Sequence, residues 1–238
     1  MDVAQTLALL WRESTPARRG PKPRYSVDDV VETAIALADS DGLDAVTIRA
    51  VAERLNVSPM SLYTYVPGKA ELLDLMLDAL YLAMPRAPHP EHWRDRLRAV
   101  ADANRELYER HRWAARVSTA RPPLGPGLMA KYEHELGALD GLGLTDVEMD
   151  AALTFLLGFV QANAVAAQDH ASAPGTDAEW WETAGPLLAR VVDPERYPLA
   201  ARVGSAAGAA QGGAYDAERA YAFGLERVLD GLAALIDA

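Results

Sequence analysis

The sequence of 238 residues contains no cysteine, which excludes disulfide bonds, thiolate catalysis and zinc sites built from cysteine. Aromatic residues make up only 7% of the chain against 50% for all hydrophobic residues, a balance typical of a packed helical protein. No apolar run reaches the roughly 18 to 20 residues that cross a bilayer. The opening Met1-Asp2-Val3 lacks the basic start of a secretory signal. We therefore expect a soluble, cytoplasmic protein.

Positive charge is also scarce, because 23 Lys and Arg stand against 34 Asp and Glu and leave a net charge of −11. Such a balance opposes binding to phosphates. The cations nevertheless gather ahead of the first expected helix, where Glu13 is accompanied by Arg12, Arg18, Arg19, Lys22 and Arg24. We expect residues 1–24 to form a flexible basic arm, which either contacts a minor groove or phosphates or is a solvated tail. The later acidic residues would keep the remainder of the chain off the phosphates.

Apolar residues recur at helical spacing along the chain, and neither strand alternation nor an internal repeat is recognisable. Ser26, Thr47 and Ser58 each precede such a segment as an N-cap, and Pro59 takes the first position of a helix. These signals predict three short helices and then a fourth from Lys69. Further helices are expected over 93–111, 113–119, 129–139, 145–170, 180–191 and 216–236, whereas the Gly/Ala-rich segment 204–213 is expected to be mobile. The prediction is an all-α protein.

Residues 47–69 have the pattern of a helix-turn-helix. Small Ala52 suits a close helix crossing, Asn56 tolerates the left-handed conformation of a tight turn, and Val57 and Leu62 can fill the core. The short helix from Pro59 is left with an N-terminal half that can enter a major groove. Two other interpretations stay open: the tyrosines at 63 and 65 could be packing residues, and the short helices could form a bundle without a nucleic-acid role.

This stretch resembles the tetracycline-repressor-like (TetR) family. The resemblance covers roughly residues 26–80 and rests on Leu62-Tyr63-Thr64-Tyr65-Val66, followed by Lys69 and Leu72-Leu73-Asp74. A weaker resemblance to the tetracycline-type sensor domain includes Trp93, Thr119-Ala-Arg-Pro122, Gly158 and Phe223-Gly224-Leu225-Glu226.

The resemblance implies an N-terminal three-helix helix-turn-helix domain that binds DNA (25–68), a connecting helix (69–85) and a C-terminal helical domain for ligand binding and dimerisation (86–238). Together with the arm and the cap, it gives the expected DNA-binding residues: Arg49, Ser58, Pro59, Met60, Ser61, Tyr63, Thr64, Tyr65, Lys69, Arg18, Arg19 and Lys22.

The family also implies a cavity for a small, largely apolar molecule, enclosed by several helices and carrying a few polar groups. The candidate contacts, each of which could equally be ordinary core, are Val100, Asn104, Tyr108, Trp113, Val117, Arg121, Met129, Tyr132, Phe155, Phe159 and Asn163. Tetracycline with magnesium is not expected, because Ser118 and Ala167 fall where that family's metal-linked histidine and glutamate would stand. We expect no metal and no cofactor.

Residues 145–170 are apolar nearly all round, so this helix must be buried on more than one side. The final helix has one apolar face and small residues on another. Either both are core helices of a monomer, or they form a four-helix interface with a second copy, which is the interpretation we adopt. The expected interface residues are Leu156, Val160, Ala164, Tyr221, Leu225, Val228 and Leu232.

No set of residues suggests catalysis. His89 and His92 lack a partnering cluster of metal ligands, and Glu133-His134-Glu135 is interpreted as a solvated helix face. The predicted function is a ligand-responsive transcriptional regulator, a homodimeric repressor of a palindromic DNA operator that a small molecule releases. One alternative is a DNA-binding regulator whose C-terminal domain only dimerises or binds a protein. A more remote alternative is an enzyme with an appended DNA-binding domain.

Overall fold

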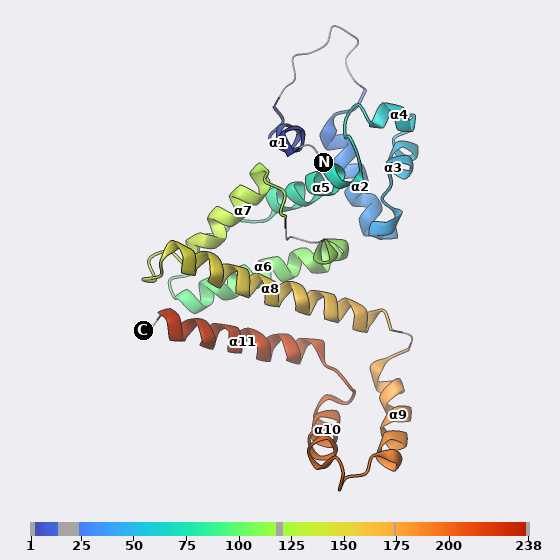
Figure 1. Cartoon of the computed structure of the whole chain (residues 1–238), viewed down its shortest axis with the longest axis vertical. Helices are drawn as coiled ribbons and strands as arrows, with labels where there is room; N and C mark the ends of the chain where they lie inside the picture. The colour runs from blue at the N-terminus through green and yellow to red at the C-terminus, as the bar shows by residue number, and fades with distance from the viewer. Residues whose placement is uncertain (1–2, 14–23, 118–120, 174, 237–238) are drawn as a thin grey trace.

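A computed structural model describes residues 3–13, 24–117, 121–173 and 175–236, and every regular element in these ranges is a helix. The predicted all-α fold is therefore confirmed (Figure 1). In chain order the elements are α1 (Val3–Leu10), α2 (Val27–Asp41), the 3-10 turn η1 (Leu43–Ala45), α3 (Ile48–Arg54), α4 (Pro59–Leu62), α5 (Lys69–Ala83), α6 (Trp93–Arg110), the 3-10 turn η2 (Arg112–Arg116), α7 (Pro126–Gly137), α8 (Asp146–Ala171), α9 (Asp177–Val191), α10 (Pro198–Gln211) and α11 (Ala217–Ile236).

The helices of the first bundle begin at the predicted caps. The Ser26 hydroxyl accepts a hydrogen bond from the backbone N–H of Asp29, whose carboxylate accepts one from the backbone N–H of Ser26 at 2.6 Å. This capping box satisfies two N–H groups that the helix itself leaves unpaired. The hydroxyls of Thr47 and Ser58 cap α3 and α4. Gly42 ends α2 with φ +85°, a conformation that other residues rarely adopt.

Helix α5 connects the two halves of the molecule, since it packs on α2 at one side and on α7 at the other. The N-terminus of α7 approaches α5 so closely that a Cβ atom on Gly125 or Gly127 would overlap Asp78. Asp78 accepts a hydrogen bond of 2.8 Å from the backbone N–H of Leu128. Burial raises the pKa of the Asp78 carboxyl, and these backbone N–H groups oppose the shift. An acidic side chain of α5 thus caps α7 from outside it.

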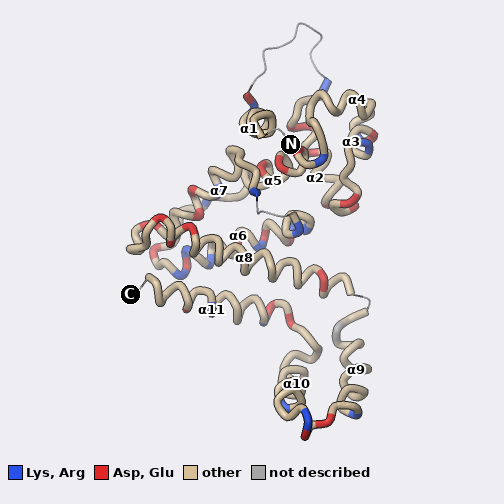
Figure 2. Tube along the Cα trace, in the orientation of Figure 1, with Lys and Arg blue, Asp and Glu red and all other residues tan. Residues whose placement is uncertain are grey.

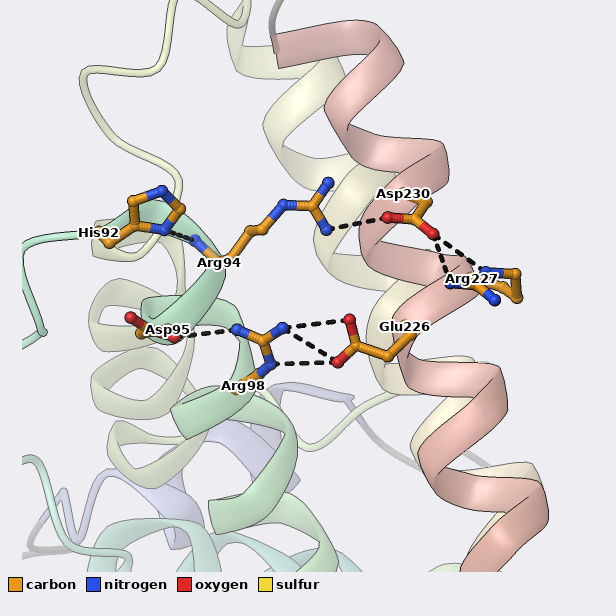
Figure 3. Close-up of polar contacts among 7 residues, drawn as sticks. All are labelled: His92, Arg94, Asp95, Arg98, Glu226, Arg227 and Asp230. Carbon is orange, nitrogen blue, oxygen red and sulfur yellow. Dashed lines mark hydrogen bonds and ion pairs between the residues drawn. The ribbon is translucent and has the colours of Figure 1, made fainter.

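The C-terminal half is built around α8, which lies between α6 and α11 (Figure 1). Leu153 and Leu156 of α8 and Leu229 of α11 are buried in this layer. Two ion pairs join α6 to α11: Arg94 to Asp230 at 3.1 Å and Arg98 to Glu226 at 3.0 Å (Figure 3). Partly exposed pairs of this kind add little stability, but they specify how the two helices align.

Helices α9 and α10 form a hairpin that extends beyond the α6–α8–α11 layer (Figure 1). The expectation of a mobile segment over 204–213 was wrong for most of its length, because α10 is helical to Gln211. Gly208 is buried, and a Cβ atom there would overlap the ring of Trp181 on α9. A glycine that is costly in an isolated helix is thus used for close packing between two helices.

The first residues also differ from the expected arm. Val3–Leu10 form helix α1, which packs on α5 with Leu10 buried. The Trp11 indole Nε1 donates to the carbonyl oxygen of Leu124 at 2.8 Å, and Arg12 pairs with Asp28 of α2. The segment therefore touches both halves of the molecule. Amphipathicity in eight residues is too short a signal to distinguish a docked helix from a solvated tail.

Helix α8 carries no charged residue between Asp150 and Asp169, so Figure 2 shows this stretch without red or blue. Among the described helices it alone is long and apolar enough to cross a membrane by length and composition. One such helix is weak evidence for a membrane span, because core helices of soluble proteins have the same composition. Part of its apolar surface, including Val147 and Phe155, is exposed to solvent in the single chain.

Candidate nucleic-acid interface and cavities

The turn between α3 and α4 has the geometry that the sequence predicted. Asn56 adopts φ +54°, in the left-handed region. The backbone N–H of Val57 donates to the carbonyl oxygen of Ala52 at 3.0 Å, which closes the turn. Ala52 and Leu62 are fully buried, so each helix holds the other at a fixed angle. The Tyr25 hydroxyl donates to the Leu55 carbonyl oxygen at 2.8 Å and ties the start of α2 to the same turn.

The outer face of α4 presents side chains to solvent. Met60 is 74% exposed and Tyr63 is 49% exposed, whereas Tyr65 is half-buried against the core. The structure thus separates the two tyrosines: Tyr63 projects outward and Tyr65 mainly packs. We name the exposed set the reading head. It consists of Arg49, Ser58, Pro59, Met60, Ser61, Tyr63, Thr64 and Lys69.

Charge is distributed unevenly over this surface. Arg49 is 81% exposed and pairs with Glu53 one turn later at 2.9 Å, so basic and acidic positions lie side by side on α3 (Figure 2). The Lys69 ammonium donates weakly to the Leu43 carbonyl oxygen at 3.4 Å and is otherwise directed to solvent. Exposed pairs of this kind exchange easily for phosphate contacts. The other predicted cations, Arg18, Arg19 and Lys22, lie outside the described residues.

A cavity of about 270 Å³ lies where α6, α8 and α11 meet. It brings together two predicted ligand contacts, Tyr108 and Asn163, with the α8 residues Val160 and Ala164. Tyr221 of α11 completes the wall, and its buried hydroxyl has no hydrogen-bond partner among the residues that the structure describes. Burial raises the pKa of this phenol to about 12, so it stays protonated and can donate.

A smaller cavity of about 120 Å³ lies between α7 and the loop that leads from α5 to α6. Val100 of α6 lines it together with two charged residues of α7, Lys131 and Glu135. The sequence interpretation of Glu133-His134-Glu135 as a solvated face was wrong for the third residue, because Glu135 is buried. The spacing of four between Lys131 and Glu135, which places both on one face of a helix, was the available signal.

Asn104 of α6 joins this charged pair. Its amide Nδ2 donates to the Glu135 carboxylate at 2.6 Å and to the Val100 carbonyl oxygen at 2.9 Å. Burial lowers the pKa of the Lys131 ammonium, and Glu135 opposes the shift. Asn104 was predicted from the sequence as a ligand contact, whereas Lys131 and Glu135 were not.

The other predicted ligand contacts do not converge on either cavity. Trp113 is buried but turns toward α2, where its indole Nε1 donates to Asp39 at 2.8 Å. The Tyr132 hydroxyl donates a hydrogen bond to Asp150 at the protein surface, and Phe155 of α8 is 55% exposed. Arg121 and Met129 are exposed, Val117 packs partly buried against the core, and the ring of Phe159 stacks on Tyr221.

The expected interface residues are also placed differently. All seven face the interior of the single chain: six are buried, and Ala164 lines the larger cavity. Because α8 is apolar nearly all round, its pattern could not show which side faces inward. Its exposed stripe, which we name the outer face, consists of Val147, Ala151, Phe155, Gly158, Ala162 and Ala166, and Phe223 and Leu235 are exposed on α11.

Metal chemistry finds no support in the described part of the chain, where no group of three or more His, Asp or Glu side chains converges. His89 instead stacks on His134 with 4.5 Å between ring centroids, and its Nε2 lies 2.8 Å from the His134 carbonyl oxygen. This contact fastens the α5–α6 loop to α7.

Comparisons with known proteins agree with this architecture. Residues 30–76 match the family "Bacterial regulatory proteins, tetR family", and residues 85–236 match "Tetracyclin repressor-like, C-terminal domain". The HTH-type transcriptional repressor DrrR1 of Streptomyces coeruleorubidus is 40% identical over 241 residues, which cover 99% of this chain and 87% of that protein.

Two solved structures of ActR from Streptomyces coelicolor are similar in fold. The apo form has a TM-score of 0.74 and 29% identity, covering 91% of this chain and 99% of that one. The complex of ActR with actinorhodin has a TM-score of 0.74 and 28% identity, covering 91% and 100%. Because the two matched families together cover most of this chain and a repressor is 40% identical along nearly its whole length, the protein is a member of the TetR family of bacterial transcriptional regulators.

Proposed function

We propose that this protein is a homodimeric repressor that holds a palindromic DNA operator and releases it when a small, largely apolar molecule binds its C-terminal domain. Residues 25–68 contact DNA, residues 69–85 transmit the signal, and residues 86–238 bind the ligand and a second copy. It acts in the cytoplasm. The observation that carries the proposal is a reading head of exposed side chains on a short helix whose angle is fixed by buried Ala52 and Leu62.

Two relatives support the repressor and ligand-binding parts of this proposal. DrrR1 is a transcriptional repressor, and ActR has been solved with a small molecule, actinorhodin, bound. For the present chain, the two cavities around α6 supply space for a ligand of that general kind. Enzymatic activity is not part of the proposal, because both families that match the chain are families of transcriptional regulators.

The second copy is expected to cover the outer face of α8 and the exposed side of α11. Phe155 and Phe223 would be the large apolar contacts, and Gly158 with the alanines would allow close approach of the helices. A two-fold axis there presents two reading heads to successive major grooves, which are roughly 34 to 36 Å apart.

Ligand and operator would be coupled through α5. The N-terminal half, including α5, is joined to the C-terminal half by three hydrogen-bonded contacts: Asp78 with the N-terminus of α7, Trp11 with Leu124, and Asp39 with Trp113. A ligand that separates helices around α6 would shift α7 and hence α5, which changes the spacing of the heads. The two ligands then oppose each other reciprocally.

The test is binding to the DNA upstream of the protein's own gene, followed by a genome-wide selection for bound sequences if that DNA is not recognised. We expect tight, salt-sensitive binding by a dimer. The double variant Tyr63→Ala/Lys69→Ala should weaken it at least about tenfold. The matched control is Tyr197→Ala/Arg196→Ala, an exposed pair on the distant α9–α10 loop, which should bind as the native protein does.

Binding to selected sequences no tighter than to random DNA would refute the proposed function. Full operator affinity in the Tyr63→Ala/Lys69→Ala variant would refute the assignment of the reading head.

A further inference from the structure

The interior of the C-terminal half contains a charged pair where apolar packing would suffice. The side chains of Lys131 and Glu135 are 8% and 4% exposed, and their charged atoms lie 2.6 Å apart. Taking two charges out of water costs several kcal/mol per ion, and pairing recovers that cost only if their remaining hydrogen-bonding capacity is satisfied. Replacement of such pairs by apolar residues is often neutral or stabilising. Stability alone therefore gives no reason for this pair.

The hydrogen-bonding capacity of the cluster is in fact left incomplete. An ammonium group has three N–H donors, and the described part of the chain supplies Lys131 with one hydrogen-bond acceptor, Glu135, and with the ring face of Tyr81, whose centroid lies 5.4 Å from Nζ. The Asn104 side-chain oxygen Oδ1 is buried and has no donor among the described residues. Unused donors and an unused acceptor thus lie around one carboxylate, since Lys131 and the Asn104 amide both bind Glu135. Leaving buried polar groups unpaired destabilises the folded protein.

The cluster also lies between the two cavities. Val100, Asn104 and Tyr108 follow one another at intervals of four along one face of α6. Val100 lines the smaller cavity, which Lys131 and Glu135 also line, and Tyr108 lines the larger one. The face of α6 that carries Asn104 thus reaches both cavities.

We propose that Lys131, Glu135 and Asn104 form the polar anchor of the ligand site and select an uncharged molecule that carries a hydroxyl group beside a carbonyl group. The hydroxyl donates to Asn104 Oδ1, and the carbonyl oxygen accepts from the Lys131 ammonium. This inference rests on the proposed function, because it specifies the ligand of that same domain.

The charges of the cluster explain why the ligand is uncharged. Glu135 neutralises Lys131, so the pair offers no net attraction to an ion. An anion at Lys131 would lie beside the Glu135 carboxylate, and a cation at Glu135 would lie beside the ammonium. Attraction and repulsion then largely cancel, and the cost of taking the ion out of water is left without compensation.

Ligand binding at this place would act directly on the connector. The polar groups sit between α6 and α7, so a ligand that reaches Asn104 Oδ1 separates these helices. The N-terminus of α7 is in close contact with α5 at Asp78 and cannot absorb the movement there. The displacement is passed to α5.

The test uses matched pairs of neutral aromatic ketones that differ by one hydroxyl on the carbon next to the carbonyl: chromone with 3-hydroxychromone, and flavone with 3-hydroxyflavone. Isothermal titration of the full-length protein should show binding of the hydroxylated member at least about tenfold tighter, as expected for a hydrogen bond made to an otherwise unpaired buried group. The absence of cysteine removes thiol addition as a source of apparent binding.

The variant Asn104→Leu removes the acceptor of the hydroxyl at similar volume, and its preference for the hydroxylated member should fall below about twofold. The variant Lys131→Met/Glu135→Leu keeps similar volume without charge and removes the donor to the shared carbonyl, so both members should bind at least about tenfold more weakly. Its matched control is Glu106→Gln/Arg110→Gln, an exposed pair with the same spacing of four on α6, which should keep the full preference. Thermal melting of each variant shows that it is folded.

Two results would overturn the anchor: native protein that binds neither member, or both equally, while still holding operator DNA, and an Asn104→Leu variant that keeps the preference. The measurement on native protein decides by itself if that variant does not fold. Operator binding is recorded in the same samples, so failure to bind any DNA would count against the proposed function instead.

Discussion

The contact between α5 and α7 depends on the absence of a side chain at Gly127. A Cβ atom there would overlap the backbone carbonyl oxygen of Asp78, which is part of a helix and cannot move independently. Gly127→Ala must therefore push the N-terminus of α7 away from α5 and weaken the bond from Leu128 to Asp78. Overpacking of this kind costs about 1–3 kcal/mol. In a chain of this size, each kcal/mol corresponds to roughly 2–4 °C in melting temperature.

We expect Gly127→Ala to melt roughly 3–10 °C below the native protein by differential scanning calorimetry. The control is Gly204→Ala, inside α10, where no described atom lies within 4 Å of the added Cβ. There alanine should stabilise the helix by up to about 1 kcal/mol. The same chemical change thus has opposite signs at two sites. A Gly127→Ala protein that melts at or above the native temperature would show that α5 and α7 are not in contact as described.

Three further predictions follow from single features. Phe155→Glu, on the outer face of α8, should convert the protein to monomers in sedimentation velocity, whereas Met60→Glu on the reading head, where the side chain is more exposed, should leave it dimeric; a dimeric Phe155→Glu protein would place the interface elsewhere. Asn56→Val should lose about 1–2 kcal/mol of unfolding free energy in urea and Asn56→Gly almost none, because only valine resists φ +54°; equal losses would contradict a left-handed turn. Hydrogen bonds from Ser26 lower the pKa of Asp29, so its contribution to stability is complete above the unfolded pKa of about 3.9 and is lost as pH falls through the lower folded value. The difference in melting temperature between native protein and Asp29→Asn should therefore shrink from pH 6 to pH 3, and a constant difference would contradict the capping box.

Local signals predicted the N-terminal bundle well. Caps at Ser26, Thr47 and Ser58, a left-handed residue at 56 and a proline at the first position of α4 each act within a few residues, so the sequence displays them directly. The exposed side of α4 followed from the same information, because the buried positions of so short a helix leave few alternatives.

The C-terminal half was predicted less completely. Its helices were predicted, but the side of α8 that faces inward was not, since a helix that is apolar all round has no polar face that marks the side exposed to solvent. Glu135 was assigned to solvent because charged residues usually are exposed, and only its neighbours Lys131 and Asn104 make its burial tolerable. Helices α1 and α10 were missed because partners distant in sequence, α5 and Trp181, stabilise them.

By itself, then, the sequence determined the helical class, the turn of the helix-turn-helix and the residues that this turn presents to solvent. These depend on interactions between residues close along the chain. Only the tertiary structure decided which face of α8 is free, which polar side chains are buried together beside the cavities, and how α7 bears on α5. Those features join residues tens of positions apart, and their energies come from burial and close packing that no local pattern records.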